Sequence, residues 1–264
     1  MRGGTVAWDR FGDGLPVVLV HGTPSWSFLW RGVVPLLARS FTVYVLDLLG
    51  YGASLLGPPN DMSISAQGRM LGELLEQWNL AAPGLVGHDI GGATVLRAHL
   101  LEGRPAGGIV LLDAVALNPW NTRTTRHMRA HLDAYRSMPP HLYEEIVKAH
   151  LRTAVYRPLD AETLDAYLRP WRGEDGQAAY FRKIEQWTEE DVGAIESLLP
   201  TLRPRVRILW GEDDRWLDRD VARRLQNLIP DAEFRLVPSA GHFAPEDNPD
   251  AVAREIGAFF GAEN

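Results

Sequence analysis

The chain has 264 residues, of which 45% are hydrophobic and 23% charged, and 27 Lys and Arg against 34 Asp and Glu give a net charge of −7. This is the composition of a globular protein, and the lack of a dense Lys/Arg cluster argues against a nucleic-acid partner. Because there is no cysteine, disulfides, thiolate metal sites and a cysteine nucleophile are excluded. The N-terminal stretch lacks the apolar segment of a signal peptide, and no run reaches the roughly 18 apolar residues of a membrane span, so we expect a cytoplasmic protein without a membrane partner.

Strand and helix signals alternate along the first 118 residues. Short apolar runs rich in β-branched residues predict strands within 5–14, 15–22, 41–54, 83–89 and 107–115. Amphipathic stretches predict helices at 27–40, 63–78 and 90–103. Strands that alternate with helices of this length indicate right-handed β-α-β units and a parallel sheet.

The alternation stops at about Pro119 and returns after about Ser197. Only helices are predicted between these positions. The pattern then resumes with a strand, a helix, a strand and a helix at 205–214, 220–229, 233–242 and 250–260. We therefore expect a core domain of residues 1–118 and 198–264, with a helical domain of residues 119–197 inserted into it.

The segment Gly87-His88-Asp89-Ile90-Gly91 lies where a predicted strand turns directly into a predicted helix. In this glycine frame the middle side chain stands on a strained turn, and the following amide points at the reaction centre from a helix N-terminus. Capping the helix is the commoner use of an aspartate at such a place. The acidic residues at 211–214 and His242 each follow a later strand, and the order nucleophile, acid, histidine favours a nucleophilic Asp89.

Five motifs can be compared with known families: "HGTPSWSFLWR" (21–31), "DLLGYGAS" (47–54), the turn at 87–91, "WGEDD" (210–214) and "AGH" (240–242). Together they resemble the aspartate-nucleophile branch of the α/β-hydrolase fold superfamily, which contains epoxide hydrolases and haloalkane dehalogenases. The resemblance covers nearly the whole chain. It implies an α/β fold with a mostly parallel, eight-stranded sheet flanked by helices, a helical cap inserted after strand 6, and no cofactor.

The resemblance also assigns roles to single residues. Asp89 would be the nucleophile, His242 the general base and Asp214 the acid that orients the histidine. Asp213 is adjacent to that acid, and some relatives carry the acid instead where this sequence has Asp113. We favour Asp214 and keep Asp113 and Asp213 as alternatives.

The segment after the first buried strand is expected to complete the site. The amides of Thr23 and Ile90 would form the oxyanion hole. Further residues of this segment are expected to shape the turn or the pocket: His21, Gly22, Pro24, Trp26 and Trp30. The histidines and carboxylates lack the spacing of a metal site, so no metal is expected.

A carboxylate nucleophile changes the chemistry that is expected. The ordinary pKa of an aspartate, about 4, means that it is already ionised at neutral pH, so no base is needed for the attack. Attack on an ester would give a mixed anhydride of higher energy, whereas attack on a saturated carbon gives a stable alkyl ester on Asp89. His242 would then activate the water that hydrolyses this ester. We expect a hydrolase that takes a small or medium apolar organic substrate and water, as a monomer or homodimer.

The leaving group separates the two enzyme classes. An epoxide oxygen needs an acidic donor such as a tyrosine of pKa about 10, whereas a halide needs only N–H donors. In haloalkane dehalogenases these donors are a Trp directly after the nucleophile and often an Asn directly after a His-Gly pair. This chain has Ile90 at the first position and Thr23 at the second. In epoxide hydrolases, tyrosines of the cap donate this proton, and the candidates in this chain are Tyr135 and Tyr180. His131 lies four residues before Tyr135, on the same face of the predicted helix, and could donate in place of a tyrosine.

Epoxide hydrolysis is therefore expected ahead of haloalkane dehalogenation. Two other interpretations stay open. A lactone hydrolase, C–C hydrolase or cyclase would use Asp89 as a base without forming an adduct. A ligand receptor could retain the fold without its chemistry.

Overall fold

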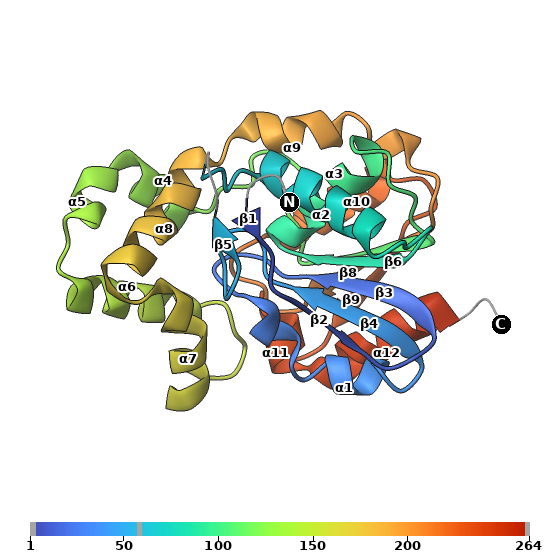
Figure 1. The fold of residues 1–264 in the computed structure, drawn as a ribbon, viewed down its shortest axis with the longest axis horizontal. Coiled ribbons are helices and arrows are strands. Elements are labelled where there is room, and N and C mark those ends of the chain that lie inside the picture. The colour runs from blue at the N-terminus through green and yellow to red at the C-terminus, as the bar shows by residue number, and fades with distance from the viewer. Residues whose placement is uncertain (1–3, 57–59, 262–264) are drawn as a thin grey trace.

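A seven-stranded sheet forms the centre of the computed structural model, which describes residues 4–56 and 60–261 (Figure 1). Its order is β2-β4-β3-β6-β7-β8-β9, and among the described pairs of this sheet only β2–β4 is antiparallel. The strands are β2 (Trp8–Phe11), β3 (Leu15–Val20), β4 (Phe41–Leu46), β6 (Gly84–His88), β7 (Gly108–Leu112), β8 (Val206–Gly211) and β9 (Glu233–Val237). The α/β-hydrolase fold with a mostly parallel sheet is confirmed.

The number of strands in the main sheet differs from the eight expected. The two-residue strands β1 (Gly4–Thr5) and β5 (Leu55–Leu56) pair with each other in a separate antiparallel sheet. The central strands β4, β6, β7 and β8 are buried along their whole length, because helices cover both faces of the sheet. The exposed edge strand β2 carries Asp9 and Arg10, charges that discourage pairing with another sheet.

Helices cover the two faces of the sheet in separate layers (Figure 1). One layer contains α1 (Val34–Leu37), α11 (Ala244–Asp247) and α12 (Pro249–Gly261), and the other contains α2 (Ile64–Gln77), α3 (Ile90–Leu100) and α10 (Arg219–Leu228). The prediction of one continuous helix at 27–40 was wrong. A 3₁₀ helix, η1 (Ser27–Trp30), and the single turn of α1 stand there instead. Pro35 lies in the first turn of α1, where a proline is tolerated, and so it starts a new helix instead of continuing one.

The segment between β7 and β8 folds into helices. They are α4 (Arg123–Ala130), α5 (Leu132–Arg136), α6 (Pro140–Arg152), α7 (Ala161–Leu168), η2 (Arg169–Trp171), α8 (Gly173–Gln186), α9 (Glu189–Glu196) and η3 (Leu199–Thr201). Helices α4 to α8 form a cap beside one end of the sheet, whereas α9 runs along α2 and α3 (Figure 1). Arg97 of α3 donates a hydrogen bond to the carbonyl of Asp191 in α9 at 2.7 Å. Part of the segment 119–197 thus packs on the core, and the domain boundaries stay a prediction.

No helix in the described ranges is long and apolar enough to cross a membrane.

The loops after β8 and β9 approach each other closely at the carboxyl edge of the sheet. The amide of Asp213 donates to the carbonyl of Ala240 at 2.8 Å. A Cβ atom on Gly211 would lie 2.1 Å from the carbonyl oxygen of Gly241, a distance that real side chains do not allow. Glycine at 211 therefore lets these two loops lie side by side.

We predict that Gly211→Ala lowers the free energy of unfolding by about 1–3 kcal/mol, because the backbone of the second loop must shift. Gly257→Ala is the matched control, since a Cβ there meets only ordinary contacts at 3.9 Å inside α12. It should raise the free energy of unfolding by about 0.5–1 kcal/mol. Urea unfolding of both variants measures the two values. Equal stability of Gly211→Ala and the wild type would contradict the close packing.

Candidate active site

Asp89 stands on a strained turn between β6 and α3. Its backbone has φ 52° and ψ −124°, a region that non-glycine residues rarely adopt. A Cβ on Gly87 would lie 2.3 Å from the carbonyl oxygen of Gly91, so only glycine fits beneath the turn. The side chain of Asp89 makes no capping hydrogen bond to α3, all of which the structure describes. The carboxylate is therefore free for another partner.

That partner is the segment after β3. The amide of Thr23 donates to Oδ1 of Asp89 at 2.8 Å, and Oδ2 lies 3.4 Å from Nε2 of His242. Burial pushes the pKa of Asp89 up, but the hydrogen bond and charge of His242 outweigh it, and the pKa is lowered overall. Ile90 begins α3, so its amide is one of the N-terminal N–H groups without an intrahelical acceptor. Asp89 is thus a buried anion held at one oxygen.

His242 lies between two carboxylates. Its Nδ1 is 2.9 Å from Oδ2 of Asp214, whose other oxygen accepts from the amides of Trp216 at 2.7 Å and Leu217 at 3.0 Å. Burial lowers the pKa of His242, but the charges and hydrogen bonds of Asp214 and Asp89 raise it well above its ordinary value. The two carboxylates therefore favour the protonated form of the imidazole.

The two alternative acids have other positions. Asp213 is exposed, and it meets the neighbouring loop through its backbone amide. Asp113 is buried at the end of β7, where its Oδ1 accepts from the amide of Gly211 at 2.6 Å. Burial, followed by the nearby charge of Asp214, raises the pKa of Asp113 well above its ordinary value. Asp113 is thus a neutral neighbour of the acid that contacts the histidine.

A small, mostly enclosed cavity of about 30 Å³ lies over Asp89, where the core meets the cap. This space holds about one or two water-sized groups. The core contributes Thr23, Pro24, Asp89, Trp216, Leu217 and His242. The cap contributes side chains of α4, α6 and α8 together with Trp120 and Trp187. The cavity combines an aromatic wall with one carboxylate.

Comparison with known proteins gives the family. A model of the alpha/beta hydrolase family matches residues 17–255. The chain belongs to this family. An alpha/beta hydrolase fold protein from Burkholderia ambifaria is 39% identical, with a TM-score of 0.91 over 95% of this chain and 93% of that one. Haloalkane dehalogenase 2 of Mycobacterium tuberculosis is 27% identical over 271 residues, covering 98% of this chain and 92% of the relative. The epoxide hydrolase CorEH is 23% identical, with a TM-score of 0.79 over 98% and 95% of the two chains, and it shares the fold.

The His21-Gly22 pair of the hydrolase, directly after β3, has a structural role. His21 is buried, where its Nδ1 donates to the carbonyl of Gly22 and its Nε2 accepts from the amide of Leu48, both at 2.9 Å. The sequence leaves Trp26 and Trp30 as candidates for the pocket wall or for the core. Trp30 is buried in the core, and Trp26 donates to the carbonyl of Ala166 in the cap at 3.1 Å. Neither belongs to the lining of the cavity over Asp89.

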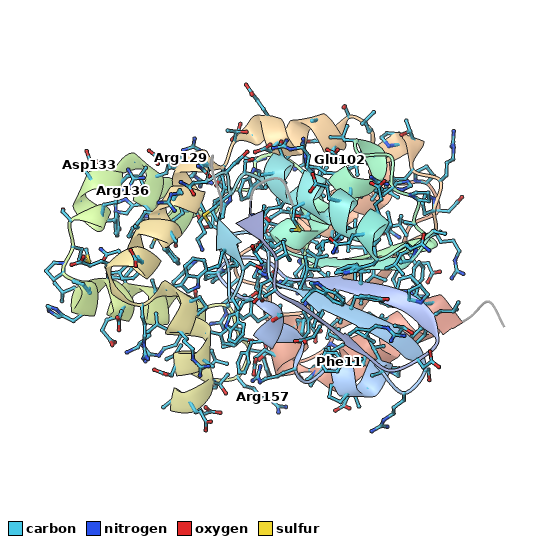
Figure 2. All side chains as sticks on the ribbon, in the orientation of Figure 1. Phe11, Glu102, Arg129, Asp133, Arg136 and Arg157 are labelled. Carbon is cyan, nitrogen blue, oxygen red and sulfur yellow. The ribbon has the colours of Figure 1, made fainter. Side chains whose placement is uncertain are left out.

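The three predicted cap donors lie in different places. Tyr180 of α8 lines the cavity, whereas Tyr135 packs against Phe181 with 5.7 Å between ring centroids. The helix is broken at His131, between α4 and α5, so the expectation that His131 and Tyr135 share one helical face was wrong. Neither His131 nor Tyr135 lines the cavity. Asp133 and Arg136, which flank Tyr135 in α5, lie at the periphery of the cap (Figure 2).

The hydrolase cavity also contains two side chains that were not predicted from the sequence, His150 and Lys183. His150 stacks on Trp216 with 4.2 Å between centroids, and burial, followed by the charges of Lys183 and His242, lowers the pKa of His150 to about 4. Lys183 is buried one helical turn after Tyr180. The two side chains share a helical face, because they are three residues apart. Within the described ranges, no group of three or more His, Cys, Asp or Glu is arranged to hold a metal ion.

Two isosteric variants test which carboxyl group controls His242. Asp214→Asn removes the charge that contacts Nδ1, and so we expect the pKa of His242 to fall. Asp113→Asn should change it far less, because a neutral Asp113 already lacks this charge. Nitrogen NMR titration of the imidazole measures both. A larger effect of Asp113→Asn would reverse the assignment.

Proposed function

We propose that the protein hydrolyses its substrate at a saturated carbon through a covalent alkyl ester on Asp89. The observation that carries this proposal is the placement of the Asp89 carboxylate. It is released from helix capping, bound at Oδ1 by the amide of Thr23, and 3.4 Å from the imidazole at Oδ2. An ionised carboxylate in this position attacks without a base.

In the first step, a lone pair of Oδ2 forms a bond to the substrate carbon. The electron pair of the broken bond leaves with the oxygen or halogen. Because the lowered pKa of Asp89 keeps it ionised, the histidine takes no proton in this step. Alkylation makes Asp89 neutral.

The second step depends on this loss of charge. His242 loses one of the two anions that raise its pKa, so the imidazole gives up its proton and becomes a base. The proton goes to the group that protonated the epoxide oxygen or, where a halide has left, to solvent. It accepts a proton from water, whose oxygen adds to the carboxyl carbon of the ester. The negative charge then develops on Oδ1, where the Thr23 amide already lies at 2.8 Å and the Ile90 amide is the second donor. Collapse releases the alcohol and restores Asp89.

Epoxides are the substrate class that the cavity favours. The side chain of Ile90, next to the nucleophile, carries no N–H for a halide. The cap instead brings the hydroxyl of Tyr180 and the amine of Lys183 to the cavity, both of which carry protons for an oxygen leaving group. The aromatic and aliphatic lining favours an apolar epoxide.

A second candidate is haloalkane dehalogenation, which two tryptophans favour. The indole N–H groups of Trp120 and Trp187 are buried without an acceptor among the described residues, and both side chains line the cavity. An N–H group of this kind is a suitable donor to a halide. The proposed covalent step is the same for both substrate classes.

We predict that His242→Gln accumulates the alkyl ester, because the attack on carbon remains but water is not activated. Incubation with 1,2-epoxybutane or 1-bromobutane should add the mass of the alkyl group to the peptide that contains Asp89. Asp89→Asn is the matched control and should stay unmodified. If His242→Gln stays unmodified with both compounds, the alkyl-ester proposal is wrong and Asp89 acts as a base or only binds a ligand.

The second candidate is tested separately. Trp120→Phe and Trp187→Phe keep the ring but remove the N–H, so each should lower halide release from 1-bromobutane by about tenfold or more. Opening of 1,2-epoxybutane should change less. Unchanged halide release in both variants would remove the argument for a halide site.

A further inference from the structure

Lys183 is connected to the nucleophile through one residue. The side chain of Lys183 is 1% exposed, and its Nζ donates to Oγ1 of Thr23 at 2.7 Å. The amide of the same Thr23 donates to Asp89 at 2.8 Å. Thr23 therefore places the lysine amine of the cap beside the carboxylate of the core.

The surroundings of Lys183 are unusual for a structural lysine. A lysine normally keeps its ammonium group in water, but here the nitrogen lies among aromatic rings. Its Nζ is 4.0 Å from the ring centroid of Tyr180, 4.1 Å from that of Trp171 and 5.3 Å from that of Tyr51. Within residues 4–56 and 60–261, no carboxylate forms an ion pair with it. Because an ammonium group has three N–H donors and Thr23 takes one, two are left for a ligand.

The composition of the chain adds a second observation. Only two lysines occur in the whole sequence, Lys148 and Lys183. Lys148 forms an ion pair with Glu145 on the outer part of the cap. Apart from the histidines, the other basic side chains are arginines, which do not release a proton in proteins. Lys183 therefore places an amine that can take up and release a proton in the cavity, in addition to the imidazole of His242.

We propose that Lys183 is the acid that donates a proton to the epoxide oxygen during the attack by Asp89. This proposal rests on the proposed function and names the donor within it. Oδ2 of Asp89 forms a bond to the epoxide carbon, the carbon–oxygen bond breaks, and its electron pair stays on the oxygen. That oxygen takes a proton from Nζ, which becomes a neutral amine.

The proton balance closes within the site. Once Asp89 is alkylated, His242 gives up the proton that the two carboxylates held on it, and this proton restores the ammonium of Lys183. In the second step, water supplies one proton to the imidazole and one to the carboxyl group of Asp89. The released alcohol takes the first proton and His242 recovers the second. The net reaction is the addition of water to the epoxide.

Lys183 suits this role better than the neighbouring tyrosine. Burial lowers the pKa of Lys183 well below its ordinary value, and the charge of Asp89 only partly opposes this, so its ammonium is a stronger acid than usual. Burial raises the pKa of the Tyr180 hydroxyl, which makes Tyr180 a weaker acid than usual. With its ring centroid 4.0 Å from Nζ, Tyr180 instead forms one wall around the cation.

The decisive experiment compares two electrophiles in one variant. Alkylation of Asp89 is followed by mass spectrometry in His242→Gln, with or without Lys183→Met, using 1,2-epoxybutane and 1-iodobutane. Lys183→Met should slow alkylation by the epoxide about 100-fold or more, the usual contribution of a positioned acid. Alkylation by 1-iodobutane should change only a few-fold, because iodide leaves without a proton. Lys148→Met is the control and should affect neither reaction.

Lys183→Arg separates proton transfer from charge. Arginine keeps a cation in the cap but does not donate its proton, so epoxide alkylation should stay as slow as in Lys183→Met. Near wild-type epoxide alkylation in either variant would overturn the proposal. Equal slowing of both electrophiles would also overturn it, because the lysine would then only support the shape of the cavity. If neither electrophile modifies Asp89 when Lys183 is present, the proposed function itself fails and this proposal fails with it.

The pH profile gives a third readout. The rate of epoxide alkylation in His242→Gln should fall as pH rises through the pKa of Lys183, because the proton donor is lost. This high-pH limb of the rate profile should be absent when Lys183→Met is added. The other titratable groups near Nζ are Asp89, Tyr51, Tyr180, His150 and His21. Nitrogen NMR of lysine-labelled protein assigns the limb directly, because only two lysines contribute signals and Lys148→Met removes one. A Lys183 signal that titrates at or above the ordinary lysine pKa would overturn the proposal.

Discussion

The strained turn at Asp89 is the constraint on which the other features of the site depend. A φ of 52° directs the carboxylate away from α3, so the side chain accepts from Thr23 and not from the first turn of its own helix. The turn is maintained because β6 and α3 are anchored on both sides. The amides of Gly92 and Val115 both donate to the carbonyl of Asp89 at 2.9 Å. The sheet and the helix thus hold a conformation that the isolated segment would not keep.

Thr23 then connects the core with the cap. Its amide holds the anion and its hydroxyl holds the amine of Lys183, so one residue fixes the distance between two groups of opposite charge from separate parts of the fold. A second connection fixes the histidine loop. His88 is next to Asp89, and its Nε2 donates to the carbonyl of His242 at 2.8 Å. Burial lowers the pKa of His88 to about 4, so its imidazole is neutral at neutral pH. The position of the His242 imidazole therefore depends on the same turn as that of the Asp89 carboxylate.

The sequence predicted those parts of the site that lie at strand ends. Asp89, Asp214 and His242 follow β6, β8 and β9, whose carboxyl ends meet at one edge of a parallel sheet, so their proximity could be inferred from the order of elements. The cap could not be inferred in this way, because helix pairing there depends on side-chain packing. His131 breaks a helix that the periodicity predicts as continuous. Lys183 follows Arg182 in an amphipathic helix, where a charged residue usually indicates a solvated face.

Charges in the cavity are stabilised mainly by the side chains that line it and not by water. About 30 Å³ admits little water, so each proton transfer changes the pKa values of the neighbouring groups strongly. In the resting state, the anions Asp89 and Asp214 favour the protonated imidazole, and Asp89 partly offsets the burial of the Lys183 ammonium. Neutralising Asp89 removes a favourable charge from both cations at once. Loss of the Asp89 charge during alkylation would therefore help the lysine to give its proton to the leaving oxygen, and would help the histidine to give up its own proton before the proposed hydrolysis of the ester.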